Sequence, residues 1–104
     1  MMRDIEWVQP GLVIGVVAGK QKTLEQIQEQ LQMQNLEQIR KWYMGYMTHL
    51  ADGTRIYFVL NSDPAEVKSN RFDQLWICGA PPKEFWENVR MTDRVPEEWR
   101  VLYI

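Results

Sequence analysis

The chain has 104 residues and a formal net charge of −2 at pH 7, and 45% of its residues are hydrophobic, which is ordinary for a folded protein. This length predicts a single domain, residues 1–104, and is too short for a complete nucleotide-hydrolysing domain. The acidic balance argues against a generally basic, nucleic-acid-binding surface, although it leaves room for a local basic patch.

Large apolar side chains are abundant, with five Trp and six Met residues. A domain of this size has a limited interior, so we expect an apolar patch on its surface. Residues 1–10 form an arm in which Trp7 is expected to pack onto the body. This arm is charged and lacks a long apolar core, and one cysteine cannot form an internal disulfide. We therefore expect no signal peptide, no membrane partner and a cytoplasmic location.

Leu12 to Ala18 is a short, β-branched apolar run that predicts a buried strand. Gly19-Lys20 follows it and invites comparison with a phosphate-binding loop. That motif needs four residues between its glycines, and Ser or Thr after its lysine. Here Gly15 and Gly19 are separated by three residues, and Gln21 follows the lysine. The sequence therefore predicts a strand end with a solvated lysine at this place.

Thr23 to Gln34 has the pattern of an amphipathic helix. Thr23 and Gln26 form a capping-box pair, which would satisfy free N–H groups at the helix start. Its apolar face has helical spacing and consists of Leu24, Ile27 and Leu31. Much of the remaining surface is glutamine, which we expect to be solvated, with a partner surface as the alternative. These glutamines are Gln21, Gln26, Gln28, Gln30, Gln32 and Gln34. We expect the helix to extend over residues 36–40.

Asp52-Gly53 is a two-residue turn signal between two aromatic-rich runs. We predict a type I′ turn, with positive φ at both residues, that pairs Tyr46–Leu50 with Thr54–Phe58. Trp42 to Leu50 is therefore expected to be a strand. If this segment were helical instead, the alternative fold would be a ferredoxin-like βαββαβ sandwich.

Ile56–Leu60 and Phe72–Cys78 are apolar runs that predict strands covered on both faces. Asn61 to Pro64 ends the first, because Pro has no N–H and Asn, Ser and Asp favour turns. Lys83 to Met91 is expected to be a second helix, with Pro82 in its first turn. A final strand is expected at Trp99–Ile104. This order predicts an α/β (α+β) domain with a mixed sheet of about five strands and two helices, in the order β-α-β-β-α-β with an extra hairpin strand.

The stretch from Gly53 to Trp86 resembles part of the ATPase domain of phage DNA-packaging terminase large subunits. In that family, a strand after an Asn-Gly or Asp-Gly turn leads into an Asp-Pro loop with a lysine, then into a second strand and a helix. The matching positions are Gly53, Ile56, Phe58, Asp63, Pro64, Val67, Lys68, Ser69, Trp76 and Ile77.

The chain departs from that family at the end of the second strand. The family has acidic residues there that handle magnesium and water, whereas this chain has Cys78 and Gly79. The resemblance therefore implies a phage or prophage protein, acting in the cytoplasm of a bacterial host, that keeps the sheet and has lost hydrolysis.

We expect no catalytic residue, no metal ion and no cofactor, because the sequence contains no complete constellation for any of them. Cys78 at a strand end is expected to be a small buried hydrophobe. His49, the only histidine, has no nucleophile and orienting carboxylate that we can assign to it. A small enzyme built on Cys78 or His49 is the least favoured alternative.

The favoured function is a non-enzymatic protein that binds another protein, as a partner module or an inhibitor, with a homodimer as one option. The candidate anchors are Trp7, Trp86 and Trp99, because aromatic residues often carry most of the affinity of an interface.

The alternative function is a small nucleic-acid-binding module related to DNA packaging. Arg55, Lys68 and Arg71 would supply a small positive patch suited to phosphate groups. A contiguous basic groove would favour this alternative.

Overall fold

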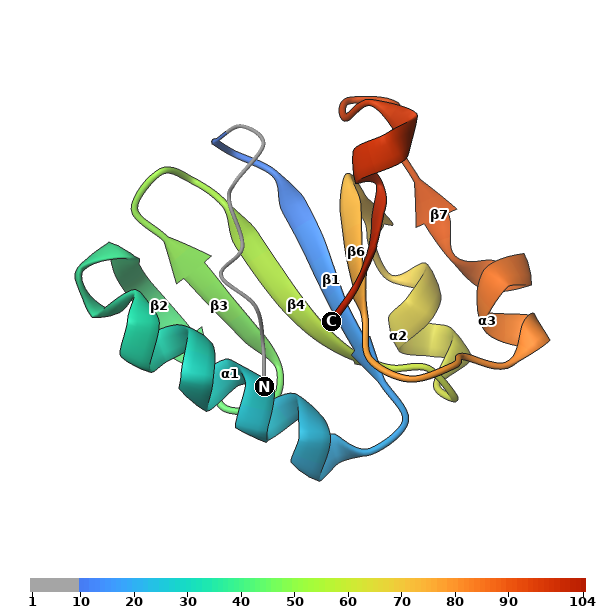
Figure 1. Ribbon diagram of the computed structural model, residues 1–104, viewed down its shortest axis with the longest axis horizontal. Coiled ribbons are helices and arrows are strands. Elements are labelled where there is room, and N and C mark those ends of the chain that lie inside the picture. The colour runs from blue at the N-terminus through green and yellow to red at the C-terminus, as the bar shows by residue number, and fades with distance from the viewer. Residues whose placement is uncertain (1–9) are drawn as a thin grey trace.

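The computed structural model describes residues 10–104, and its centre is a mixed six-stranded sheet (Figure 1). The strand order is β2-β3-β4-β1-β6-β8, with β5 and β7 as a separate parallel pair. β1 is parallel to β4 and β6, and β8 is parallel to β6, whereas β2, β3 and β4 form an antiparallel meander. The strands are β1 (Val13–Ala18), β2 (Ile39–Tyr43), β3 (Met47–Leu50), β4 (Arg55–Leu60), β5 (Arg71–Phe72), β6 (Gln74–Ile77), β7 (Arg90–Met91) and β8 (Val101–Tyr103).

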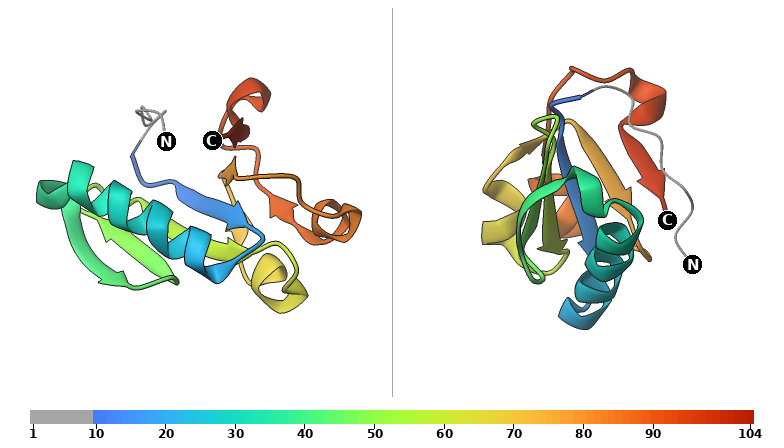
Figure 2. Two further views of the ribbon diagram at one scale, coloured as in Figure 1. Left: turned by 60° about the horizontal axis from the view of Figure 1, so that its bottom comes forward. Right: turned by 90° about the vertical axis from the view of Figure 1, so that its left-hand side faces the viewer.

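Three α-helices cover the sheet: α1 (Gln21–Gln34), α2 (Pro64–Lys68) and α3 (Lys83–Asn88). Two short 3-10 helices lie at Leu36–Gln38 and Glu97–Trp99. α1 lies by β2, β3 and β4, whereas α2 and α3 gather on the side of β6 (Figures 1 and 2). The expected α/β class with a mixed sheet is therefore confirmed, with six strands and an extra pair in place of about five strands.

The sheet has a buried layer on each face. On one face α1 packs against side chains of β1, β3, β4 and β6, which form the larger cluster. Its members are Leu12, Ile14, Val16, Ala18, Leu24, Ile27, Leu31, Leu50, Ile56, Phe58, Trp76 and Val95. On the other face α2 and α3 contribute Val67 and Phe85 to a smaller cluster. Its other members are Val17, Val59, Phe72, Leu75 and Ile77. No residue of β2 or β3 belongs to this second cluster, so α2 and α3 leave that side of the sheet uncovered.

α1 begins at Gln21, two residues earlier than expected, and Lys20 precedes it without a side-chain capping bond. The predicted capping box at Thr23 is therefore wrong, whereas the predicted apolar face is buried as expected. Gln28 is also fully buried, so the expectation of a solvated glutamine surface is wrong at this position. Its Nε2 donates to Tyr43 O, Met47 O and Thr48 Oγ1, each at 3.0 Å, and its Oε1 accepts from Gly45 N at 2.6 Å.

Trp42 to Leu50 contains a hairpin turn, so the predicted single strand is wrong. β2 ends at Tyr43, and β3 begins at Met47. Gly45 in the turn has φ of +73°, a conformation that glycine adopts without strain. The predicted extension of the first helix over residues 36–40 is also wrong, because these residues form a 3-10 turn and the start of β2. Since this segment is not helical, the ferredoxin-like alternative is wrong as well.

The hairpin of β3 and β4 at Asp52-Gly53 is confirmed, with Met47 opposite Tyr57 and His49 opposite Arg55. The predicted type I′ turn is wrong, because Gly53 has φ of +88° and Asp52 does not have positive φ. Gly53 N donates to Leu50 O at 3.1 Å, and Leu50 N donates to Thr54 O at 2.9 Å. This is the three-residue type of hairpin loop, in which a left-handed glycine follows a tight turn.

The segment between β4 and β6 was expected to be a polar loop but contains α2. Asp63 Oδ1 accepts from Ala65 N at 3.1 Å and from Glu66 N at 3.3 Å, and Pro64 occupies the first turn. The predicted strand Phe72–Cys78 is divided at Asp73, which is buried and whose Oδ2 accepts from Val13 N at 2.7 Å. Asp73 also forms an ion pair with Arg94 at 3.2 Å. Asp73 is therefore a buried and paired carboxylate in the middle of the predicted strand.

The second predicted helix is present as α3, which ends at Asn88 rather than Met91. The final strand is confirmed as β8, which joins the sheet beside β6.

Candidate functional site

The face of β2, β3 and β4 that points away from α1 carries a row of basic side chains. Lys41 is directly opposite His49, and His49 is directly opposite Arg55. Residues opposite each other in antiparallel strands share a face, and neighbouring strands lie about 4.8 Å apart, so this row is about 10 Å long. Thr48, which precedes His49 on β3 and therefore points to the other face, bonds to Gln28 of α1, so the basic row lies on the face away from α1.

A row of tyrosines runs beside the basic row. Tyr43, Met47 and Tyr57 are opposite one another in the register, two residues along each strand from Lys41, His49 and Arg55. Tyr46 from the turn packs between the other rings, with centroids 6.4 Å from Tyr43 and 6.2 Å from Tyr57. We refer to this surface as the basic–aromatic face. It consists of Lys41, Tyr43, Tyr46, His49, Arg55 and Tyr57.

The cations of this face have no acidic partner within the described residues. Lys41 Nζ lies 5.4 Å from the ring centroid of Tyr43, and Arg55 Nη1 donates to Tyr57 Oη at 3.5 Å. Neither Lys41 nor Arg55 forms an ion pair within residues 10–104. The nearby carboxylate of Glu66 accepts a bond from Leu60 N at 3.4 Å. The face therefore presents positive charge that an anionic ligand would neutralise.

A second group of cations flanks the basic–aromatic face. Arg71 is directly opposite Arg90 in the β5–β7 pair, and like charges in that position destabilise a sheet. Arg90 Nη2 donates to Lys68 O at 2.5 Å, which gathers three basic residues at one place. We refer to Lys68, Arg71 and Arg90 as the flanking basic cluster. A small cavity of about 20 Å³ lies between this cluster and the tyrosines, and it is lined by Tyr46 and Tyr57 together with Glu66, Ser69 and Asn70.

The residues predicted as phosphate contacts lie in these two groups. Arg55 is in the basic–aromatic face, and Lys68 and Arg71 are in the flanking basic cluster, all three exposed. Sequence reasoning missed the tyrosines, Lys41 and Arg90, and it considered His49 only as a residue of the least favoured alternative, a small enzyme. Gly45 was the available signal, because a turn at this glycine would have shown which residues alternate between the two faces of β2 and β3.

The predicted tryptophan anchors lie elsewhere. Trp86 on α3 is 40% exposed, and Trp99 in the second 3-10 helix is 47% exposed. Trp42 on β2 is 48% exposed, whereas Trp76 is fully buried and its Nε1 donates to Gln74 Oε1 at 3.0 Å. Trp7 lies outside the described residues. Large apolar side chains are therefore on the surface, and the exposed tryptophans lie on three different elements, β2, α3 and the second 3-10 helix.

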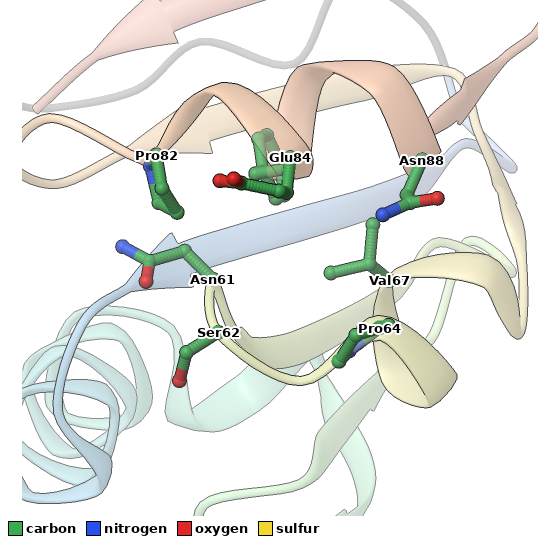
Figure 3. A pocket seen from close by; sticks show the side chains of 8 residues that line it. Asn61, Ser62, Pro64, Val67, Pro82, Glu84 and Asn88 are labelled. Atoms are coloured by element: carbon green, nitrogen blue, oxygen red, sulfur yellow. The ribbon is translucent and has the colours of Figure 1, made fainter.

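A larger cavity of about 260 Å³ lies between α2 and α3, beside the carboxyl end of β4 (Figure 3). Open α/β sheets often bind ligands beyond the carboxyl ends of their strands. The polar side chains that line it are Asn61, Ser62, Glu84 and Asn88. No basic side chain lines this cavity, and Glu84 brings a carboxylate, so its chemistry does not suit a phosphate group.

The glycines of the incomplete phosphate-loop pattern have packing roles. A Cβ atom at Gly15 would lie 3.0 Å from the ring of Phe72 and 3.1 Å from Leu75, so this glycine allows close packing inside β1. Gly19 follows β1, and a Cβ there would make only ordinary contacts with Asn61. Neither feature forms a loop that surrounds phosphates.

Cys78 and His49 lie near opposite ends of the sheet. Cys78 N donates to Val17 O near the end of β1, whereas His49 is opposite Arg55, which pairs with Val13 at the start of β1. Four residues of strand span about 13 Å, so the two side chains do not form a catalytic pair. Within residues 10–104, no group of three or more His, Cys, Asp or Glu side chains is arranged to hold a metal ion.

No helix in the described part of the chain is long and apolar enough to cross a membrane. Comparison with known proteins finds no family model and no curated protein that matches the chain. The resemblance to terminase ATPase domains therefore stays a prediction.

Proposed function

We propose that this protein is a non-enzymatic module that binds nucleic acid through the basic–aromatic face. The observation that carries the proposal is the row Lys41–His49–Arg55, which lies beside tyrosines on the sheet face away from α1, where the buried cluster under α2 and α3 includes no residue of β2 or β3. Positive side chains bind phosphate groups, and they position nucleic acid without reading its sequence. This function was the alternative prediction from the sequence, and the residues named for it there belong to the two basic groups.

The overall charge of −2 does not oppose this proposal, because binding depends on the local field. The basic–aromatic face and the flanking basic cluster together hold Lys41, His49, Arg55, Lys68, Arg71 and Arg90. Much of the acidic charge lies on other elements. Glu25 and Glu29 are on α1, Glu84 and Glu87 are on α3, and Glu97 and Glu98 are in the second 3-10 helix.

The test is binding of a labelled oligonucleotide, measured by fluorescence anisotropy at several salt concentrations. The double variant Lys41→Gln/Arg55→Gln removes both permanent charges of the row. We expect weaker binding and a salt dependence whose logarithmic slope falls by about 0.7–0.9 for each lost phosphate contact.

The matched control is Lys22→Gln/Lys83→Gln, which removes the same charge from exposed positions on α1 and α3. If the control weakens binding as much as the test variant, the face is not the binding site and only net charge matters. Absence of any binding by the wild type at low salt would refute the proposal.

The proposal of a non-enzymatic protein has its own test, which is hydrolysis of ATP or GTP. We expect no magnesium-dependent turnover, because Gly15 is a packing glycine and because Cys78-Gly79 follows β6 where a metal-binding acid would be needed. Turnover that disappears in the Lys20→Ala variant would contradict this expectation.

The second candidate is the function that the sequence analysis favoured, binding of another protein as a partner module or inhibitor of phage type. It is supported by the exposure of Trp86 and Trp99, since Trp is enriched among the residues that dominate interface energies. Trp86→Ala and Trp99→Ala would then leave the unfolding transition unchanged while weakening self-association, measured by sedimentation velocity. A wild-type protein that remains monomeric and binds only nucleic acid would exclude self-association through these residues.

A further inference from the structure

The tyrosines of the basic–aromatic face remain largely exposed, although each is a large side chain. Tyr43 is 49% exposed and Tyr46 is 54% exposed, and Tyr57 is half-buried. The buried cluster on this side of the sheet is formed by residues of β1, β4, β5, β6, α2 and α3, with Tyr57 only at its edge. The rings of Tyr43 and Tyr46 are therefore not needed to complete the core, and together they leave aromatic surface available to a ligand.

The rings are tilted relative to one another rather than stacked. The interplanar angle is 57° between Tyr43 and Tyr46, and 75° between Tyr46 and Tyr57. In such edge-type pairs at least one ring face is not covered by its aromatic neighbour. The ammonium group of Lys41 lies over one face of the Tyr43 ring, so a base would stack on the other face or take the place of this ammonium group.

The two rows have a spacing that suits a nucleotide strand. They run across β2, β3 and β4 in parallel, about 7 Å apart, because residues two apart in a strand are separated by about that distance. A chain lying across these strands would place its phosphates on the basic row and its bases on the tyrosines. The small cavity beside Tyr46 and Tyr57, at about 20 Å³, has room for a water molecule and not for a base. Bases would therefore stack on the surface rather than enter a pocket.

This geometry distinguishes unpaired nucleotides from a duplex. In a duplex the base faces are covered by neighbouring bases, and only the base edges are accessible in the grooves. In a single strand, by contrast, each base can offer its face to an aromatic side chain, and such stacking tolerates any sequence.

We propose that the basic–aromatic face binds unpaired nucleotides in preference to a duplex, with the bases stacked on Tyr43, Tyr46 and Tyr57. This inference rests on the proposed function and names its ligand class, a single-stranded nucleic acid bound without strong sequence preference. DNA and RNA share the chemistry that the face recognises.

The experiment compares labelled single-stranded DNA, single-stranded RNA of the same sequence and the corresponding DNA duplex. Each is about 16 nucleotides long, which is the upper end of the length that one small binding face covers. We expect both single strands to bind at least about tenfold more tightly than the duplex at equal salt concentration. Tighter binding of the RNA than of the DNA would identify RNA as the ligand and would likewise support the inference.

The stacking variant is Tyr43→Leu/Tyr57→Leu, which keeps apolar side chains and removes the aromatic faces. We expect it to weaken single-strand binding at least about fivefold, since each stacked base contributes measurably to affinity. Tyr43→Phe/Tyr57→Phe keeps the rings and should bind like the wild type. Tyr103→Leu is the matched control, because Tyr103 is 62% exposed on β8 and lies outside the face.

The outcomes separate this inference from the proposed function. One outcome is that single strands and duplex bind equally, that the leucine variant binds as the wild type does, and that Lys41→Gln/Arg55→Gln binds more weakly. In that case the inference is wrong and the proposed function stands. If no nucleic acid binds, both are wrong. Poly-glutamate that displaces a single strand as well as an unlabelled strand does would also overturn the inference, because the face would then recognise charge alone.

Discussion

At the scale of single residues, Gln28 shows how one polar side chain fixes a turn. It is fully buried between α1 and the β2–β3 hairpin, and its amide bonds to four groups of that hairpin. Tyr43 O has a second donor, Tyr46 N at 3.0 Å, but Gly45 N has no partner other than Gln28 Oε1 among the described residues. The buried N–H of Gly45 is therefore the group that most depends on Gln28.

We predict that Gln28→Leu lowers the free energy of unfolding by about 2–3 kcal/mol, because a buried group left without a partner costs about 1–3 kcal/mol and other bonds are lost with it. Urea denaturation measures this change. Gln30→Leu on the exposed side of the same helix is the control and should change stability little. Equal midpoints for the two variants would contradict the role assigned to Gln28.

The helix pattern places Gln28 on the buried side, four residues after Leu24 and three before Leu31, but it does not show which groups would satisfy the buried amide. The apolar spacing correctly gave Leu24, Ile27 and Leu31, but Gln28 lies on the same side of α1, toward the hairpin. The spacing of apolar residues shows which side of a helix is buried, but it does not show how a polar residue on that side is bonded. A polar residue on that face is recognised only when its partners are known, and here those partners are backbone groups of a turn that the sequence analysis did not place.

At the scale of elements, α2 illustrates a short helix that depends on its first residues. It has five residues, too few to be stable in isolation, and Asp63 satisfies two of its free N–H groups. Asp followed by Pro is a recognised start signal for a helix, so this element was open to prediction from Asp63-Pro64. The sequence analysis instead treated the pair as a strand stop, which is also true, since β4 ends at Leu60.

We predict that Asp63→Ala lowers the free energy of unfolding by about 1 kcal/mol, the usual cost of losing such a cap. Asp63→Asn keeps an oxygen acceptor and should preserve most of the stability. Thermal unfolding of the two variants measures the difference. Indistinguishable stability of Asp63→Ala and wild type would show that α2 is held by Val67 and its packing alone.

At the scale of the whole molecule, the candidate site depends on strand register. Arg55, Lys68 and Arg71 were chosen from the sequence because they are basic and near predicted strands. Lys41 and the tyrosines join them only because the turn around Gly45 sets which residues of β2 and β3 are opposite each other. A shift of one residue would move each side chain to the other face. The sequence analysis did not place the turn around Gly45, which sets the register of β2 and β3. The fold class does not depend on that register and was predicted, whereas the site depends on it and was predicted only in part.

The exposed edge of the sheet also affects whether copies of the molecule associate with one another. β2 is an outer strand of the described sheet and carries the exposed side chains of Trp42, Tyr43 and Met44 at its end. Exposed edge strands tend to pair with other chains unless bulges or charges prevent it. β2 has an irregularity in its pairing between Ile39 and Lys41, and Arg40 and Lys41 are both exposed. These features protect the edge against association.

We predict that the wild type does not associate through β2, and that Arg40→Val/Lys41→Val does. The substitutions remove both charges and leave a continuous apolar strand, Ile39 to Tyr43, at the edge of the sheet. Sedimentation velocity over a range of protein concentrations should show a rising apparent mass for this variant alone. Arg40→Lys/Lys41→Arg conserves the charges and should sediment as the wild type does. If the valine variant also sediments unchanged, the charges do not protect the edge, and the irregularity near Arg40 is sufficient to prevent pairing.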